Sequence, residues 1–130
     1  MKQITIMDKY PVVTLTIAKT ETKYKNIDEI LECLKTEIEA HPIATYIGEF
    51  DHYTHTSNLE VGEIADDILD AKNIICCFGK ALPKPEFLAV RPRAIGVAEM
   101  RESFVVSFME APNPEAHAAM EKWVQGIANK

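Results

Sequence analysis

A cluster of basic residues between positions 80 and 93 has the side chains best suited to ligand binding in this sequence. Its basic members are Lys80, Lys84, Arg91 and Arg93. Glu86 is the one acidic residue among them, so the segment carries 4 − 1 = +3, whereas the whole chain carries 14 − 20 = −6. Arg91 precedes a proline, which favours extended backbone and places both arginines on the same side, as paired hydrogen bonds to an oxyanion require. The sequence therefore predicts a site for a small anionic ligand. The alternative is ion pairing to nearby glutamates or plain solvation of an exposed loop.

The segment from Asp51 to His55 places ionisable side chains near the end of an expected strand. In a strand, His52 and His55 point to opposite faces, so they can share a metal ion only if the strand ends between them. Asp51 and His55 share a face with Glu49, and a neighbouring carboxylate orients a histidine and raises its basicity. We expect Tyr53 and His55 to line the anion site beside the arginines. The alternative for His55 is a hydrogen-bonded ring at the sheet edge.

Two adjacent cysteines, Cys76 and Cys77, are followed by a glycine and a lysine. A thiol at such a strand end, beside a cation, can have a lowered pKa and act as a nucleophile. The alternative is that both side chains fill the core as small hydrophobic groups. A metal, haem or redox site would combine either cysteine with His52 or His55, which makes these four residues the candidate metal ligands. The chain has no C-x-x-C motif, so the sequence leaves the cofactor unknown.

Hydrophobic periodicity indicates the segments that position these residues. Asn26 and Glu29 form a capping box at the start of an amphipathic helix that Pro42 ends, and Asn113 and Pro114 begin a closing helix. A weaker amphipathic helix is expected over 60–71, and an irregular, proline-rich stretch over 79–92. The expected strands are 11–19, 43–54, 73–78 and the two arms of an antiparallel hairpin, 93–100 and 103–110.

The order β-α-β-α-β-β-β-α with one hairpin predicts an α+β fold, a two-layer sandwich with a mostly antiparallel sheet and helices packed on one face. The chain of 130 residues has no linker, so we expect a single domain over 1–130. The second face of the sheet is expected to carry Thr14, Thr16, Tyr53 and residues such as Phe104. Because large apolar patches rarely stay exposed, we predict a homodimer that covers this face.

Charge and composition limit the classes of binding partner and the cellular compartment that we expect for this protein. The acidic balance repels phosphate backbones and anionic lipid, so we expect neither nucleic acid nor membrane as a partner. The first eleven residues lack the apolar core and cleavage pattern of a signal peptide, and no window has the apolar length of a membrane span. The three cysteines are an odd number and two are adjacent, which favours reduced thiols. These features predict a cytoplasmic protein.

The layout from residue 43 to residue 128 resembles small bacterial α/β proteins of the domain of unknown function 302 type. The residues that carry the resemblance are the strand IATYIGEFDHYT, the segment NIICCFGKAL, the hairpin RAIGVAEMRESFVVSFMEAPNP with its Ala-Pro-Asn-Pro ending, and the closing helix. The resemblance implies an architecture and supplies no catalytic residue.

No glycine-rich phosphate loop, Ser-His-Asp pattern or H-E-x-x-H motif is present, so the sequence favours a binding protein over an enzyme. We predict a small-molecule binding module for an anionic ligand. The alternatives are a metal, haem or redox protein built on cysteine and histidine, and a protein-interaction subunit without a small-molecule site.

Overall fold

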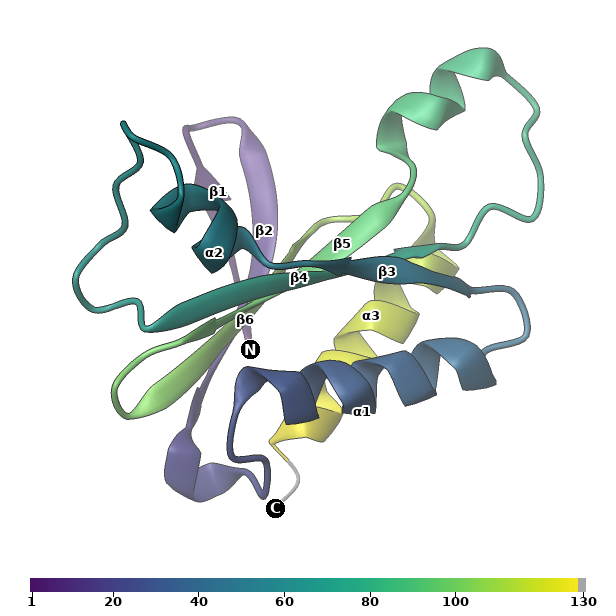
Figure 1. The fold of residues 1–130 in the computed structure, drawn as a ribbon. Coiled ribbons are helices and arrows are strands. Elements are labelled where there is room, and N and C mark those ends of the chain that lie inside the picture. Colours follow the sequence, from purple (N-terminus) through teal and green to yellow (C-terminus); the bar gives the residue numbers. More distant parts are fainter. Residues whose placement is uncertain (129–130) are drawn as a thin grey trace.

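The computed structural model describes residues 1–128 and contains a six-stranded sheet in which all neighbouring strands are antiparallel (Figure 1). The spatial order is β1-β2-β6-β5-β4-β3, so β1 and β3 form the edges. The strands are β1 (Lys2–Ile6), β2 (Tyr10–Ala18), β3 (Thr45–Phe50), β4 (Asp70–Cys77), β5 (Arg93–Glu99) and β6 (Ser103–Met109). The helices are α1 (Ile27–Ala40), α2 (His52–Ser57) and α3 (Pro114–Ile127), with two 3-10 turns, η1 (Lys19–Glu21) and η2 (Pro85–Val90).

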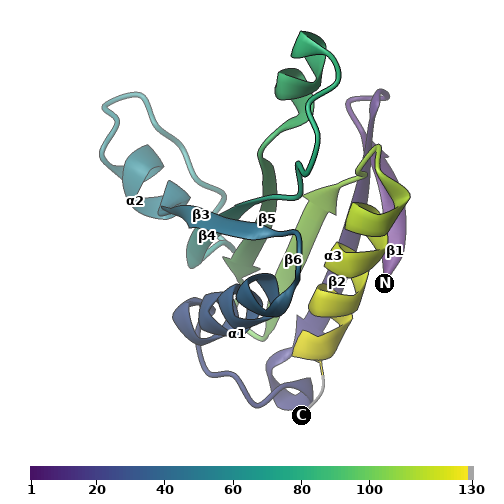
Figure 2. The same cartoon turned by 90° about the vertical axis from the view of Figure 1, so that its right-hand side faces the viewer.

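The two long helices, α1 and α3, cover one face of the sheet, whereas α2 and η2 rise from the other face (Figure 1, Figure 2). The expected α+β two-layer sandwich is therefore confirmed. The hydrophobic core lies between the sheet and the long helices, and its fully buried members include Ile17, Leu34, Ile38, Ile74, Ile95, Phe104 and Met120. We call the face that α1 and α3 leave uncovered the open face.

Local capping explains why both long helices begin where the sequence predicts. The Asn26 side chain accepts a hydrogen bond from the Glu29 backbone N–H at 2.9 Å, which satisfies a first-turn donor of α1. After α1 ends, His41 Nδ1 accepts from the N–H groups of Ile43 and Ala44, both at 3.1 Å. The Asn113 side chain caps α3 in the same way. Both predicted helices are confirmed.

The predicted hairpin is confirmed as β5 and β6, but its burial corrects one expectation. Phe104 pairs with Ile17 of β2 and is fully buried beneath the helices. The prediction that residues such as Phe104 lie on the bare face is wrong, because strand alternation places Phe104 with Val106 and Phe108 on the covered side. Thr14 and Thr16 pair with Ser107 and Val105 on the open face.

The strand expected over 43–54 extends further at its carboxyl end than the observed strand β3. β3 ends at Phe50, and the Asp51 side chain then accepts a hydrogen bond from the Thr54 N–H at 3.0 Å and caps α2. This side-chain cap offers the backbone a helical alternative to the sheet ladder. The prediction that Glu49, Asp51 and His55 share one strand face is therefore wrong. Tyr53 lies on α2 rather than on the sheet.

The helix expected over 60–71 is also wrong, because this segment forms turns and extended chain before β4 begins at Asp70. Gly62 packs so closely against α2 that a Cβ at that position would stand only 2.0 Å from the Thr56 carbonyl oxygen. The Leu69 N–H donates to the Glu99 carbonyl at 2.8 Å, which ties the segment to β5 instead of to a helix. Tertiary contacts thus override a weak amphipathic pattern.

The first strand, β1, has no counterpart among the expected elements, because every one of its residues is exposed and its hydrophobic alternation is short. It joins β2 through a tight turn in which Met7 and Asp8 have positive φ values of 53° and 58°. Within residues 1–128, none of the helices has the length and apolar character that crossing a bilayer requires.

Candidate functional site

A cavity of about 490 Å³ lies where η2, the start of β5 and the beginning of α3 meet; we call it the arginine cavity. Arg91 and Arg93 both line it. Its apolar wall is formed by Phe78, Phe87, Val90, Ala111, Pro112 and Ala116. Two guanidinium groups thus border a mostly apolar space of a size typical for small-molecule sites.

Arg93 is held by backbone carbonyl groups. Its Nη2 donates to the carbonyl oxygens of Met109 at 2.6 Å and Glu110 at 3.0 Å, and its Nη1 donates to that of Val90 at 3.3 Å. Arg93 therefore ties the end of η2 to the end of β6. Burial lowers the pKa of Arg93, but an arginine stays charged in proteins at neutral pH. Its charge faces neutral acceptors.

Arg91 keeps more of its hydrogen-bonding capacity. Its Nη1 donates to the Ala81 carbonyl oxygen at 2.7 Å, and its guanidinium lies 5.8 Å from the centre of the Phe87 ring. Gly79 makes room for this arrangement, since a Cβ there would stand 2.8 Å from the Arg91 Nη1. Within residues 1–128, neither Arg91 nor Arg93 pairs with a carboxylate.

The remaining polar groups of the arginine cavity come from α3 and η2. Asn113 lines the cavity, and its side chain accepts from the N–H groups of Glu115 and Ala116 at the start of α3. The amino end of a 14-residue helix adds a partial positive charge there. Glu86 is exposed and also lines the cavity, so its carboxylate opposes anion binding.

The other residues predicted for the anion site lie elsewhere. Lys80 and Lys84 are exposed and do not line the arginine cavity. His55 is exposed on α2, with its ring 5.4 Å from that of Phe50. Tyr53 lines a second cavity, described below, between α2 and the open face. The structure thus joins the two arginines but does not bring Tyr53 or His55 to them.

The four candidate metal ligands do not form a cluster. His52 and His55 lie one turn apart on α2 above the open face, with ring centres 6.1 Å apart. Cys76 is fully buried on the opposite side of the sheet, and burial raises the pKa of its thiol to about 11. The Cys77 sulfur accepts from the Gly79 N–H at 3.4 Å. In the described part of the chain, no three His, Cys, Asp or Glu side chains gather as a metal site would need.

Sequence reasoning missed the aromatic support of the arginine cavity. Phe78, which lines the cavity, stacks on Trp123 of α3 with ring centres 5.5 Å apart and an interplanar angle of 17°. The His41 ring meets both of these rings edge-on. The residues come from three distant parts of the sequence, and only the position of Phe78 directly before the basic cluster could have indicated a role.

The fold and its cavities define a class: a two-layer α+β protein with a positively charged, partly apolar cavity at one end of the sheet. The chain belongs to a family of unknown function, DUF6858, whose model matches residues 1–129. This family is not the domain of unknown function 302 that the layout resembles. The resemblance is therefore correct only in pointing to a family of unknown function. No curated protein and no solved structure matches this chain.

Proposed function

We propose that this protein is a small-molecule binding module that holds an anion with an apolar part, such as an aryl or alkyl carboxylate, in the arginine cavity. One observation carries the proposal: two guanidinium groups border a mostly apolar cavity, and neither pairs with a carboxylate of residues 1–128. A bound carboxylate would supply the missing counter-charge, and its apolar part would cover the Phe78 and Phe87 rings.

The roles of the two arginines differ in this proposal. Arg91 binds the anion, because the Ala81 carbonyl engages only its Nη1 and leaves further N–H donors available. Arg93 adds positive charge and shapes the cavity, since its terminal nitrogens already hold three carbonyl oxygens. The partial charge at the start of α3 adds to this field.

Benzoate is a suitable probe because Trp123, the single tryptophan, stacks on a ring that lines the cavity. We expect benzoate to change the Trp123 fluorescence saturably. Arg91→Gln should weaken benzoate binding by about tenfold or more, since hydrogen bonds to charged groups contribute roughly 1.5–3 kcal/mol. Glu86→Gln should tighten it several-fold, because it removes a like charge. Calorimetric titration gives the affinities.

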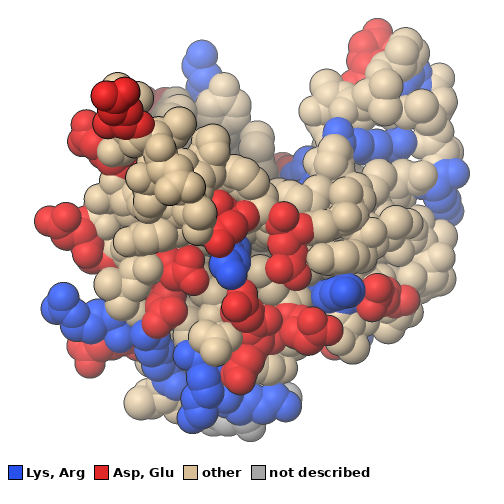
Figure 3. Space-filling view, viewed as in Figure 1, with Lys and Arg blue, Asp and Glu red and all other residues tan. Residues whose placement is uncertain are grey.

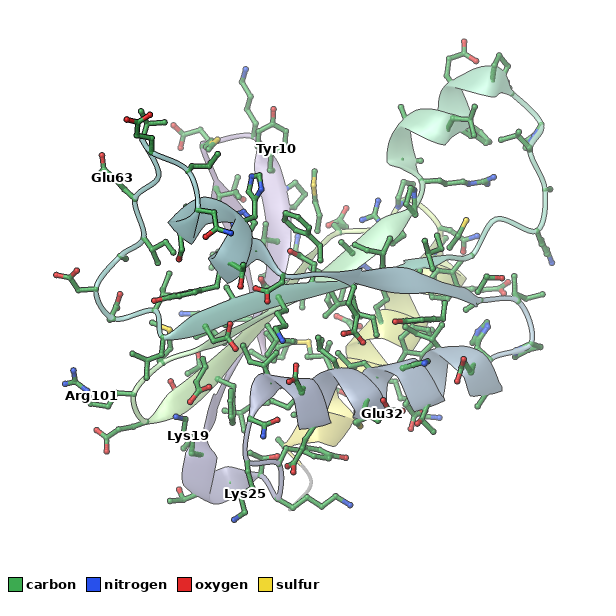
Figure 4. The ribbon with its side chains drawn as sticks, in the orientation of Figure 1. Tyr10, Lys19, Lys25, Glu32, Glu63 and Arg101 are labelled. Atoms are coloured by element: carbon green, nitrogen blue, oxygen red, sulfur yellow. The ribbon has the colours of Figure 1, made fainter. Side chains whose placement is uncertain are left out.

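Lys25→Gln is the matched control, since it removes one positive charge at the start of α1, away from the arginine cavity (Figure 4). We expect its affinity for benzoate to equal that of the unmodified protein. Equal affinities of Arg91→Gln and the unmodified protein would refute the proposal, and so would the absence of saturable binding of both benzoate and hexanoate.

The alternative functions receive less support from the geometry. A joint site of Cys76 or Cys77 with His52 or His55 would need at least three ligating side chains close together, and the described residues bring no such group together; Cys76 also lies beneath the helices, whereas both histidines lie above the open face. The three cysteines are unpaired, which suits the cytoplasm that we propose as the compartment.

An interaction role is favoured by one surface. Ile4 of β1 lies opposite Val12 of β2, which lies opposite Met109 of β6, and Ile6 lies opposite Tyr10. Ile4, Ile6, Tyr10 and Met109 are each 40–45% exposed on the open face, where Figure 4 shows Tyr10 on the side away from α1.

We also propose that a second copy of the chain packs against this apolar row, giving the homodimer. Ile4→Lys is expected to convert a dimer to a monomer because the lysine introduces a charge that the interface would bury without a partner. Native mass spectrometry measures both species. Lys2→Gln, on the same strand, serves as the control that keeps the dimer mass. A monomer mass for the unmodified protein at micromolar concentration would contradict the homodimer.

A further inference from the structure

A second cavity, of about 340 Å³, lies between α2, the segment that follows it and the open face of β4, β5 and β6; we call it the sheet cavity. It is separate from the arginine cavity, because it lies over the middle and the Asp70 end of β4, whereas the arginine cavity lies beyond Cys77. Figure 3 shows that the parts of the chain that carry α2 and η2 rise separately from the sheet, with a hollow between them.

The floor of the sheet cavity is a row of three residues across neighbouring strands. Asn73 of β4 lies opposite Gly96 of β5, which in turn lies opposite Ser107 of β6. Gly96 has no side chain, so the Asn73 amide and the Ser107 hydroxyl lie on either side of an open space. A Cβ at Gly96 would stand 3.3 Å from Asn73 Nδ2 and 3.9 Å from Ser107 Oγ.

The two polar side chains of this floor have unused hydrogen-bonding capacity. Within residues 1–128, no protein group pairs with the side-chain amide of Asn73 or with the hydroxyl of Ser107. Neither the Asn73 amide nor the Ser107 hydroxyl is fully buried, so both can form hydrogen bonds to a molecule in the cavity. An amide offers a donor and an acceptor, and a hydroxyl can serve as either.

The charged groups at this cavity do not face its floor. Lys72 Nζ is engaged with Asp28 Oδ1 of α1 at 2.7 Å on the other side of the sheet. Glu63 is exposed in the segment beyond α2, at the outer rim (Figure 4). His52 is also exposed, with its Nδ1 3.1 Å from Thr56 Oγ1. A charged ligand would therefore lose its hydration without gaining a counter-charge.

The walls favour an apolar or aromatic ring. Ile64 and Ile68 from the segment after α2, Ala98 and Val105 from the sheet, and Tyr53 from α2 line the cavity above the polar floor. Burying such a ring supplies affinity, while the floor fixes its orientation, as in many small-molecule sites.

We propose that the sheet cavity is a second binding site, specific for an uncharged small molecule that presents a hydrogen-bond donor beside an acceptor, such as a primary carboxamide on a ring. The carboxamide pairs with Asn73 and Ser107 over Gly96, and the ring lies against the isoleucines. This site does not depend on the proposed function of the arginine cavity.

Three probes of nearly equal shape test which functional group the sheet cavity binds. Benzamide has both donor and acceptor, acetophenone accepts but does not donate, and benzoate is charged. Backbone amide NMR shifts of the full chain locate binding, and their concentration dependence gives affinity. We expect benzamide to shift the signals of Asn73, Gly96 and Ser107 and to bind about fivefold or more tightly than acetophenone at this site, since the additional hydrogen bond that benzamide donates has a net effect of this size. Benzoate should leave these signals unchanged.

Substitutions then assign the contacts. Asn73→Leu keeps the branched outline of the side chain without its polar atoms and should weaken benzamide binding about tenfold, while Ser107→Ala, which perturbs the fold least, should weaken it about threefold. Gly96→Ala should also weaken it, because the added methyl group occupies the space between the two polar side chains. Thr45→Ala, an exposed change on β3 outside the cavity, is the matched control.

Benzamide affinities that are unchanged in both Ser107→Ala and Gly96→Ala would overturn the proposal. Equal binding of the three probes, or benzamide shifts confined to residues around Arg91, would overturn it as well. The benzoate titration followed by Trp123 reports on the arginine cavity alone, so the failure of either site is recognised separately.

Discussion

Replacing Phe104 with alanine is expected to lower the free energy of unfolding by about 3–5 kcal/mol, the usual cost of removing a large aromatic side chain from a core. Phe104 is fully buried between the sheet and the long helices, and it pairs across the ladder with Ile17 and Glu99. The surrounding strands and helices cannot collapse into the space, because the sheet fixes their spacing. Urea denaturation followed by circular dichroism measures the change.

Phe50→Ala is the matched control for this measurement, because it removes the same side chain from the open face. Phe50 is 42% exposed and contacts the rings of His52 and His55. We expect a loss of less than about 1 kcal/mol, in keeping with partial burial. Similar losses for the two variants would mean that the open face is covered as fully as the helical face, for example by a second copy of the chain.

Replacing Arg93 with methionine is expected to lower the free energy of unfolding by about 2–3 kcal/mol, since hydrogen bonds to a charged group are among the stronger ones. Methionine keeps much of the apolar length but leaves three carbonyl oxygens, those of Val90, Met109 and Glu110, without their donor. The end of η2 would then lose its attachment to β6. Urea denaturation measures this change too.

Arg101→Met controls for the loss of an arginine, because Arg101 is exposed at the hairpin turn between β5 and β6 (Figure 4). Its expected effect is within about 0.5 kcal/mol. If Arg93→Met were as stable as Arg101→Met, the bonds between Arg93 and the carbonyl groups would contribute nothing to the fold, and Arg93 would be available to a ligand. This outcome would change the roles proposed for the two arginines.

The difference between Arg91 and Arg93 also decides how binding should be studied. Arg93 variants alter the cavity itself, so a loss of affinity in them has two explanations. Arg91 is held by one carbonyl contact and by the Phe87 ring, so its replacement tests binding more directly.

Much of the fold follows from interactions between residues close in the sequence. The Asn26 and Asn113 caps, the helical spacing that follows each of them, and the alternation of β2 are local patterns, and the structure confirms the elements they predict. The proximity of Arg91 and Arg93 to one another is equally local, because one residue, Pro92, separates them.

One failure of prediction is itself local, because the Asp51 side chain that ends β3 accepts from the Thr54 N–H three residues further along the chain. The others occur where a distant contact decides the structure, since Gly62 and Leu69 are held by α2 and β5 rather than by their neighbours in the chain. The face of the sheet on which Phe104 lies depends on the position of the long helices, which the alternation alone does not give.

The same division between local and distant contacts applies to the candidate sites. The gathering of basic residues between positions 80 and 93, and the formation of a sheet with helices by the flanking segments, follow from the order of residue types along the chain. Three other features depend on the folded arrangement: Arg93 binds carbonyl groups 16 and 17 residues away, Tyr53 and His55 lie apart from it, and Asn73, Gly96 and Ser107 form one row. The physical reason is that strand register and packing bring together groups far apart in the chain, whereas hydrophobic periodicity and capping act within a few residues.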